Sequence, residues 1–355
     1  MIQRVAVVGA GTMGAGIAQL CAQSGFGVKV HDPLPAALEA LPGRLKKSLD
    51  AAVLKGKLGT QQADRAYHSV SPAATLEDLA GADLVIEAAP ENLALKQDIF
   101  EMLSKICPDA LLATNTSSLS VAEIMKRASS PERTLGVHFF NPPVAMKLVE
   151  MIRTRDTSPD AFRAAFEFVL MGLKRTPVDV KDVPGFIVNR VMRPYYVSSQ
   201  RLAGGDLSFA KIDEACRSLG GVPMGPFELM DLIGLDVNLA ITKSIYEALG
   251  RPERFSPPAL QQALVDGGMT GRKTGKGFYL YESGQMTGEN PDALALRTGA
   301  GAADAWASLR GALIAEAERV VNEGTASATD VDTAIRLAMN FPKGPLEWRK
   351  ESTAA

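Results

Sequence analysis

Residues 4–32 read RVAVVGAGTMGAGIAQLCAQSGFGVKVHD, and this stretch decides the fold of the N-terminal part of the chain. The apolar run Val5–Val8 predicts a buried strand, a glycine-rich turn leads from it into an apolar helix, and the residues up to Asp32 predict a second strand. The turn has the spacing G-x-G-x-x-G, formed by Gly9, Gly11 and Gly14. Strand, turn, helix and strand in this order predict a parallel sheet with crossover helices.

The glycine-rich turn has the residues that a dinucleotide needs. Gly9 permits the tight turn, Gly11 lets a pyrophosphate approach the backbone, and Gly14 lets the helix pack against the strand, while the helix N-terminus offers N–H groups to the anion. Asp32 follows about 20 residues later, where a carboxylate accepts hydrogen bonds from both ribose hydroxyls and repels a 2′-phosphate. The stretch therefore predicts NAD rather than NADP, with Thr12 and Met13 among its contacts.

Residues 136–150, GVHFFNPPVAMKLVE, carry the predicted chemistry. They place His138 and Glu150 on two predicted strands joined by an Asn-Pro-Pro turn, in a chain with only 3 histidines. A neutral imidazole can take a proton from an alcohol, and a carboxylate on its other nitrogen holds the tautomer and stabilises the imidazolium. By itself, a histidine before two aromatics is more often a core residue. The dinucleotide-binding stretch favours the acid–base interpretation.

Composition restricts the class of protein. A chain of 355 residues with 46% hydrophobic residues and a net charge of −2 predicts two or three globular domains without a basic surface for nucleic acid. No apolar run is long enough to span a membrane, and the first strand begins too early for a signal peptide. The cysteines lack metal-ligand spacing, so we expect no metal, a reducing compartment and a cytoplasmic location. They are Cys21, Cys107 and Cys216.

Strands and helices alternate up to about residue 183, which predicts a doubly wound, Rossmann-type α/β domain over 1–183 with a helical-hairpin arm over 36–66. Thr60 is the expected cap of the second arm helix. Further predicted helices cover Leu93–Ile106 and Pro159–Gly172. The further predicted strands are Tyr67–Val70, Asp83–Ala89, Leu111–Asn115, Thr134–Phe140, Lys147–Ile152 and Thr176–Val180.

The remaining chain predicts an all-helical domain over 184–282, a linker rich in glycine over 283–303, and a shortened second copy of the helical domain over 304–355. The repeat appears when the chain is shifted by 119 residues on itself. The matching positions include turn-setting residues, which makes chance similarity of two helical hairpins a poor explanation. Gly205, Ser208, Asp213, Ala215, Pro223, Gly225, Pro226 and Glu228 fall on Gly324, Ser327, Asp332, Ala334, Pro342, Gly344, Pro345 and Glu347.

The glycine-rich turn is followed in order by three further motifs: NTSS at 115–118, HFFNP at 138–142 and PGFIVNR at 184–190. With these motifs the chain resembles the L-3-hydroxyacyl-CoA dehydrogenase family over residues 1 to about 282. The resemblance implies NAD-dependent oxidation of a 3-hydroxyacyl-CoA to the 3-oxoacyl-CoA, as in fatty-acid β-oxidation. It also implies a dimer in which the helical domains of two subunits pack together.

The resemblance implies roles for individual residues. His138 matches the general base and Glu150 its carboxylate partner, while Ser117 matches a hydroxyl that contacts substrate and nicotinamide, and Asn189 an amide that holds the thioester. Without the resemblance, a helix N-cap for Ser117 and a hydrogen bond at the domain boundary for Asn189 would be favoured. Further NAD contacts are expected at Glu91, Lys96, Asn141 and Lys273, although Glu91 and Lys96 by themselves would be an acid at a helix start and a solvated lysine. CoA contacts are expected at Ser48 and Lys55, where a solvated helix face is the alternative.

Two features leave alternatives open. The shortened second copy is absent from most single-function members of the family, so the chain could be a monomer with an internal pseudo-dimer of helical domains, or a homodimer. A relative acting on a CoA-free hydroxy acid, such as gulonate or carnitine, is the nearest enzymatic alternative, and Ser48 and Lys55 argue against it. A non-catalytic dinucleotide-binding or structural protein is the other, and intact His138 and Glu150 argue against that one.

Overall fold

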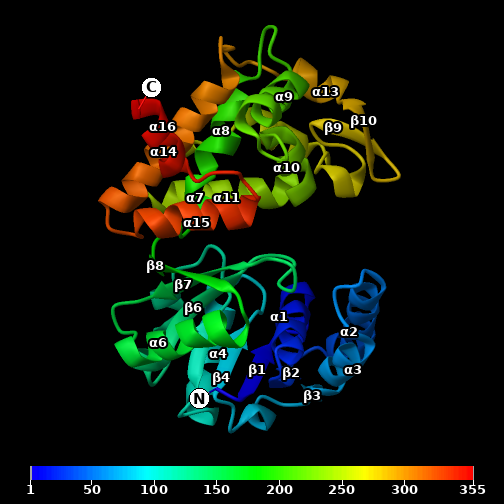
Figure 1. Cartoon of the computed structure of the whole chain (residues 1–355), viewed down its shortest axis with the longest axis vertical. Coiled ribbons are helices and arrows are strands. Elements are labelled where there is room, and N and C mark those ends of the chain that lie inside the picture. The colour runs from blue at the N-terminus through cyan, green and yellow to red at the C-terminus, as the bar shows by residue number, and fades with distance from the viewer. Residues whose placement is uncertain (1, 355) are drawn as a thin grey trace. The chain divides into compact units, whose positions relative to one another are not determined.

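The structure, a computed structural model, describes residues 2–354, without the side chains of 352–354. The chain forms two compact units, which divide between Val183 and Pro184. The N-terminal unit contains a sheet with helices on its faces, and the C-terminal unit is mainly helical (Figure 1). This confirms the predicted class, an α/β sheet of the Rossmann type followed by a helical part.

The N-terminal unit is built on an 8-stranded sheet in the order β3-β2-β1-β4-β5-β6-β7-β8. Strands β1 to β6 are parallel, whereas β7 runs antiparallel to β6 and β8 is parallel to β7. The direction reverses there because a short turn joins β6 to β7, and a parallel pair needs a longer crossover. The strands are β1 Arg4–Val8, β2 Gly27–His31, β3 Val70–Ala73, β4 Leu84–Glu87, β5 Leu111–Thr114, β6 Thr134–Phe139, β7 Leu148–Arg153 and β8 Thr176–Lys181.

Helices connect the parallel strands and cover a core of aliphatic residues. Because β1 lies between β2 and β4, the chain changes its winding direction beside β1, and a ligand is expected at the carboxyl ends of these strands. The helices are α1 Thr12–Gln23, α2 Pro35–Leu54, α3 Thr60–His68, α4 Leu93–Ile106, α5 Val121–Met125 and α6 Pro159–Glu167, with η1 Glu77–Leu79, η2 Pro131–Arg133 and the π-helical turn η3 Phe168–Gly172.

Three local predictions in this unit were wrong. The predicted strand Tyr67–Val70 begins too early, because Tyr67 and His68 complete α3, whose buried Ala63 and Ala66 follow helical spacing. Gly59, not Thr60, is the N-cap of α3. The helix expected over Pro159–Gly172 is regular only to Glu167 and then widens into the π-helical turn η3.

The C-terminal unit holds both copies of the helical domain. We predicted a linker over 283–303, but this segment contains β10, which pairs with β9, and the helix α13. Asn290 holds this segment against the preceding loop, since its buried side chain donates to the Gly277 carbonyl oxygen at 2.7 Å. The elements are α7 Val188–Val191, α8 Arg193–Leu202, α9 Phe209–Gly220, α10 Pro226–Ile233, α11 Leu235–Ala248, η4 Glu253–Phe255, α12 Ala259–Asp266, η5 Arg272–Thr274, β9 Tyr279–Glu282, β10 Gln285–Glu289, α13 Pro291–Ala295, α14 Ala305–Asn322, α15 Ala328–Met339 and α16 Pro345–Ala354.

The internal repeat is confirmed at the level of single hydrogen bonds. Asp213 accepts from the backbone N–H of Phe227 at 3.0 Å, and its counterpart Asp332 accepts from that of Leu346 at 2.8 Å. In each copy an aspartate on the first helix thus caps the second helix. The ion pair between Arg217 and Glu228 also recurs in the second copy, and the corresponding residues are Arg336 and Glu347.

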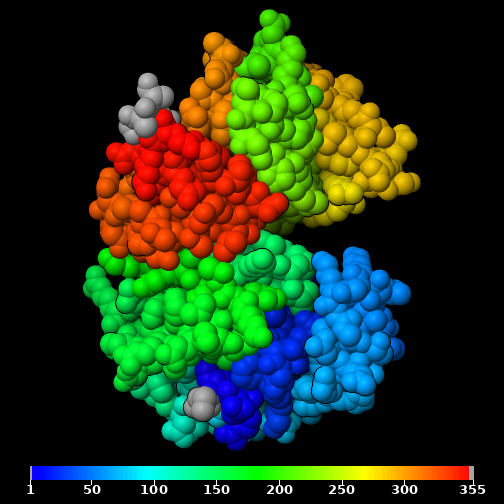
Figure 2. All heavy atoms as spheres, viewed as in Figure 1, coloured from blue at the N-terminus to red at the C-terminus, as the bar shows by residue number. Residues whose placement is uncertain are grey.

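The second copy packs on the first within the C-terminal unit. Helix α14 contacts α7, α8 and α9, and in the space-filling view the orange and red surface of the second copy adjoins the green surface of the first copy (Figure 2). The indole of Trp306 fills the space beside Gly220, where an added Cβ would lie 2.8 Å from the ring. Phe341 contributes a second aromatic contact, with its ring centroid 6.0 Å from that of Tyr195. The repeat is therefore part of this unit's core.

Candidate active site

The glycine-rich turn has the shape that its sequence predicts. Gly9 has φ +105°, and a Cβ there would lie 2.6 Å from the Ala88 carbonyl oxygen at the end of β4. At Gly14 a Cβ would lie 1.8 Å from the Gly9 oxygen, whereas at Gly11 it would meet nothing within 4 Å. Packing of the protein therefore requires the first and third glycines, and the second leaves open space of the kind that a pyrophosphate needs.

Helix α1 begins at this turn with N–H groups available for an anion. Its N-cap is Gly11, which offers no side chain, and its first turn, with Thr12 and Met13, contains no acidic residue. Asp32 follows β2 directly and accepts from the N–H of Ala10 at 2.8 Å and of Leu34 at 3.0 Å. The residues of the turn and of its rim therefore fit a dinucleotide with free ribose hydroxyls.

His138 and Glu150 form a buried pair across two strands. They are directly opposite each other in the antiparallel register of β6 and β7. The Nδ1 atom of His138 donates to Oε2 of Glu150 at 2.7 Å, and the two residues are 6% and 0% exposed. A carboxylate only accepts, so the shared proton lies on Nδ1 and Nε2 is the ring nitrogen that can take another proton. The pair thus has the geometry of a general base with its orienting carboxylate.

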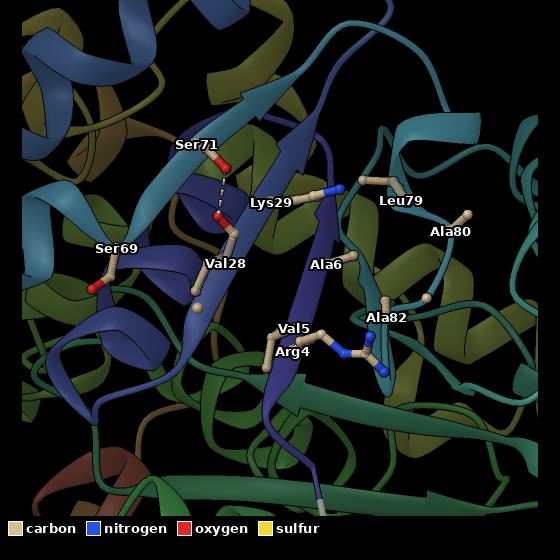
Figure 3. Close-up of a pocket in the computed structure, with 12 residues that line it drawn as sticks. Arg4, Val5, Ala6, Val28, Lys29, Ser69, Ser71, Leu79, Ala80 and Ala82 are labelled. Carbon is tan, nitrogen blue, oxygen red and sulfur yellow. Dashed lines mark hydrogen bonds between the residues drawn. The ribbon is translucent and has the colours of Figure 1, made fainter.

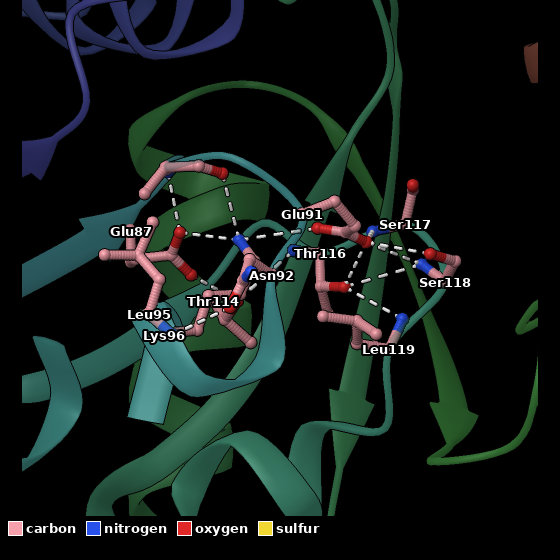
Figure 4. A network of polar contacts seen from close by, with 11 residues as sticks. Glu87, Glu91, Asn92, Leu95, Lys96, Thr114, Thr116, Ser117, Ser118 and Leu119 are labelled. Atoms are coloured by element: carbon pink, nitrogen blue, oxygen red, sulfur yellow. Dashed lines mark hydrogen bonds and ion pairs between the residues drawn. The ribbon is translucent and has the colours of Figure 1, made fainter. Parts of the chain in front are cut away.

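Glu91 holds the turn that contains Ser117 (Figure 4). Its Oε1 accepts from the N–H groups of Ser117 and Ser118 at 3.0 and 3.1 Å, and from the hydroxyls of Ser118 and Thr116 at 3.0 and 2.6 Å. Burial works against the ionised form, but these hydrogen bonds and the charge of Lys96 lower the pKa of Glu91 below its usual value. The N-cap of α5 is Ser120, so the helix-cap alternative for Ser117 was wrong.

Lys96 is buried, which excludes the solvated alternative for this lysine. Its Nζ lies 2.6 Å from Oε1 of Glu87, 3.1 Å from the Ala89 oxygen and 3.4 Å from Oε2 of Glu91. Glu87 also accepts from the Thr114 hydroxyl at 2.6 Å. We did not predict Glu87 as a site residue, although an acid at the end of an apolar strand was a usable signal. Lys96 therefore connects a buried acid to the carboxylate that holds the Ser117 turn.

A cavity of about 300 Å³ lies beside the glycine-rich turn and brings together three of the predicted residues, Thr12, Ser48 and Asn141. Arg44 of α2 reaches the same place, and its Nη1 donates to the Ala10 oxygen at 2.7 Å. We did not predict Arg44 as a site residue. Lys55 follows α2 as an exposed C-cap and is not among the lining residues. The other lining residues are Ala15, Gly16, Gln19, Leu45, Pro142, Pro143 and Val144.

A second cavity in this unit, of about 320 Å³, lies at the amino ends of β1 and β2 (Figure 3). Its two cationic side chains are already bound: Arg4 donates to Asp83 at 2.9 Å, and Lys29 to the Asp78 carbonyl oxygen at 2.5 Å. Ligands of doubly wound sheets bind at the carboxyl ends of the strands. This cavity is therefore not the dinucleotide site.

Asn189 and Lys273 belong to the C-terminal unit. Asn189 lies in α7, and its carbonyl oxygen accepts from Nε of Arg193 at 2.8 Å. Lys273 lies in η5 and forms an ion pair with Asp236 at 2.9 Å. Their contacts with substrate and cofactor stay predictions.

Residues 2–354 contain neither a candidate metal site nor a candidate membrane span. In that range no group of three or more His, Cys, Asp or Glu side chains is arranged to hold a metal ion. None of the described helices has the length and apolar character needed to cross a membrane. Cys21, Cys107 and Cys216 are buried thiols.

Comparison with known proteins links both units to one family. Residues 4–183 match the family described as "3-hydroxyacyl-CoA dehydrogenase, NAD binding domain", and residues 185–281 and 308–354 match "3-hydroxyacyl-CoA dehydrogenase, C-terminal domain". The second match covers both copies of the helical domain. Asp32, His138 and Asn189 thus all lie within matched regions.

Individual relatives and a solved structure point to the same family. The 3-hydroxyadipyl-CoA dehydrogenase of Escherichia coli is 35% identical over 98% of this chain and 90% of its own length. A 3-hydroxybutyryl-CoA dehydrogenase of Mycobacterium tuberculosis is 40% identical over 79% of this chain and 99% of its own. The crystal structure of 3-hydroxybutyryl-CoA dehydrogenase from E. coli superposes with a TM-score of 0.90, 33% identity, and coverage of 99% and 92%.

The position of Asp32 predicts the choice of cofactor. The chain should prefer NAD(H) over NADP(H) at least about tenfold, or about 1.4 kcal/mol, because a 2′-phosphate would meet the carboxylate. Replacing Asp32 by Ala and Pro33 by Arg together should reduce this preference, as measured by kcat/KM with each cofactor. Equal use of both cofactors by the unmodified protein would show that Asp32 does not bind the ribose.

The lowered pKa of Glu91 predicts a pH-dependent contribution to stability. Because the folded protein favours the ionised carboxylate, Glu91 stabilises the fold above the usual carboxyl pKa, and this contribution is lost as the pH falls through its lowered value. Glu91→Gln should lower the free energy of unfolding at pH 7 by about 1 kcal/mol.

Denaturant titrations at pH 7 and at pH 3 test this, and the difference from wild type should shrink at the lower pH. Glu101→Gln, which changes an exposed i,i+4 pair with Lys105 on α4, the helix that follows Glu91, is the control and should have a smaller effect. A difference that stays constant with pH would contradict the ionised contact.

Proposed function

The chain belongs to the 3-hydroxyacyl-CoA dehydrogenase family, and on that premise we propose that His138 and Glu150 perform the proton transfer of its reaction. The protein is an NAD-dependent oxidoreductase that interconverts 3-hydroxyacyl-CoA and 3-oxoacyl-CoA. The observation that supports our assignment is the buried 2.7 Å hydrogen bond between His138 Nδ1 and Glu150.

In the oxidative direction Nε2 of His138 takes the proton of the 3-hydroxyl group, and the imidazolium that forms is stabilised by Glu150. Bound NAD would supply the acceptor for the hydride that leaves C3. Ser117 contacts the reacting oxygen as a neutral donor, and Asn189 holds the thioester. In reduction the same imidazolium returns the proton to the carbonyl oxygen.

The cofactor contacts are proposed along the carboxyl edge of the sheet. The glycine-rich turn and the N-terminus of α1 bind the pyrophosphate, and Asp32 binds the ribose hydroxyls. Ser48 and Lys55 on the arm are proposed to bind CoA, for which the cavity beside Ser48 and the charge of Lys55 are suitable. The proposed NAD contacts are Gly9, Gly11, Thr12, Met13, Gly14, Asp32, Glu91, Lys96, Ser117, Asn141 and Lys273.

The substrate is proposed to be a short 3-hydroxyacyl-CoA, because the relatives reported above are named for butyryl and adipyl esters. CoA esters in these names favour our assignment over a CoA-free hydroxy acid. We also propose a cytoplasmic location, because all three cysteines are free, as is usual in a reducing compartment.

The second helical copy is proposed to make the C-terminal unit self-sufficient. In the family the helical domains of two subunits pack together, and here α14 covers α7, α8 and α9 of the same chain. We propose that α14 covers the surface that a partner subunit would otherwise use. The proposed state of the protein is a monomer, or a dimer built on another surface.

Substitution of the proposed base is the direct test of the reaction chemistry. His138→Ala or His138→Gln should lower kcat by at least about a hundredfold, the usual scale for loss of a general base, with NADH affinity nearly unchanged. Glu150→Gln should also lower kcat and move the midpoint of the pH–rate profile to lower pH, because an amide cannot stabilise the imidazolium.

Steady-state kinetics with 3-oxoacyl-CoA esters of increasing length and NADH measure these effects and the length preference together. Near-wild-type turnover of the His138 variants would rule out the assignment. An unchanged midpoint in Glu150→Gln would show that the two residues are not coupled.

Truncation after Ala303, which keeps β10 and α13 and removes α14 to α16, tests the proposal on assembly. It removes the second copy and exposes apolar side chains of the first, such as Tyr195, so the truncated chain should self-associate or aggregate more than the full chain. Light scattering measures the mass per particle of both. If mass and solubility are the same, the second copy does not replace a subunit.

A further inference from the structure

Helix α7, which contains Asn189, cannot keep its position by its own hydrogen bonds. It has 4 residues, and helices that short are not stable without tertiary contacts. The residue before its N-cap, Phe186, is in the left-handed region with φ 47°, so the chain also turns sharply there. The position of Asn189 therefore depends on what holds the side chains of α7 and of the following helix.

Two buried arginines hold this segment, one on each side of Asn189. Arg193 donates from Nε to the Asn189 oxygen at 2.8 Å, and from Nη1 to the Asn238 oxygen at 3.2 Å and the Thr242 hydroxyl at 3.0 Å. These contacts stay within the first copy of the helical domain. Arg190 is 1% exposed, and its partners lie elsewhere.

Both partners of Arg190 come from the second copy. Its Nε donates to Oε1 of Glu316 in α14 at 2.9 Å, and its two terminal nitrogens bind the Glu323 carboxylate at 2.7 and 2.9 Å. Glu316 is 0% exposed and also accepts from Arg254 at 2.6 Å and Arg319 at 3.2 Å. A guanidinium with two carboxylates, one of them fully buried, is a fixed arrangement rather than a mobile surface pair.

The first copy has no acidic residues at the positions that correspond to Glu316 and Glu323. When the chain is shifted by 119 residues, Val197 corresponds to Glu316 and Gly204 to Glu323. Leu309 of the second copy corresponds to Arg190. At these corresponding positions the arginine occurs only in the first copy and the two acids only in the second. The ion pairs therefore join the two copies once, with no symmetric counterpart.

We propose that the second copy is part of the active-site support: Glu316 and Glu323 hold Arg190, and through it they set the position of Asn189. Arg190, Glu316 and Glu323 are positioning residues, since they contact α7 and not the reacting atoms. The inference rests on the proposed role of Asn189. Removing one of the two acids leaves the buried Arg190 guanidinium with a single carboxylate partner, and we expect α7 to shift in response. Small displacements of positioned groups cost rate.

The test uses the full chain with Glu316→Gln, Glu323→Gln and, as a control, Glu318→Gln. Glu318 lies on the same helix but pairs with Arg349, away from Arg190. Glu316→Gln should lower kcat/KM for the acyl-CoA substrate at least about tenfold and Glu323→Gln less, with the Kd for NADH within about twofold of wild type. Glu318→Gln should behave as wild type. Arg190→Lys, which keeps the charge, should retain more activity than Arg190→Met.

A double-mutant cycle with Asn189→Ala separates positioning from general stability. If Glu323 acts through Asn189, then Glu323→Gln should lower kcat/KM in the wild-type background and have little further effect in Asn189→Ala. The side chain of Glu323 is half-exposed, so this variant should fold even if Glu316→Gln does not. Melting temperatures confirm that each variant is folded at the assay temperature.

Three outcomes would overturn the inference in different ways. If Glu316→Gln and Glu323→Gln keep the kcat/KM of the control, the acids only stabilise the unit, whatever happens to the melting temperature. If their effects add fully to that of Asn189→Ala, they act elsewhere. If Asn189→Ala itself keeps wild-type turnover, the proposed role of Asn189 fails and the inference fails with it, whereas the His138 variants still report on the proposed function.

Discussion

A carboxylate that is removed from water needs a charged or hydrogen-bonding partner. Three fully buried glutamates have such partners, and each partner lies at or next to a proposed site residue. Glu150 holds the ring of His138, Glu87 holds Lys96 and, through it, the carboxylate over the Ser117 turn, and Glu316 holds Arg190 beside Asn189. In each case the buried acid lies behind the functional group and fixes a cation or an imidazole. Leaving any of them unpaired would cost several kcal/mol, so the same contacts that keep the fold also keep the proposed site in register.

The N-terminal unit brings its groups together because parallel strands end at one edge. Gly9 follows β1 and touches Ala88 at the end of β4, Asp32 follows β2, and the Ser117 turn follows β5. His138 lies one strand further, where the reversal between β6 and β7 puts Glu150 opposite it. A reversal of strand direction thus adds the proposed acid–base pair at the dinucleotide-binding edge of the sheet.

The two helical copies of the C-terminal unit share some contacts and differ in others. Asp213 and Asp332 cap a helix in the same way in both copies. The ion pair of Arg190 with Glu316 joins the first copy to the second and has no counterpart at the corresponding positions. Burial of apolar side chains, such as Trp306 against Gly220, also stabilises the contact between the two copies.

The sequence by itself determined the features that depend on neighbours along the chain. Turn glycines, alternation of strands and helices, and the spacing of His138 and Glu150 follow local rules, so the glycine-rich turn, most element bounds and the repeat were predictable. Only the tertiary structure decided that Lys96 is buried beside Glu87, that residues 285–289 pair as a strand, and that Arg190 meets an acid 126 positions away. These depend on which surfaces pack together, because the charge pattern that suits a solvated helix face also suits a buried pair.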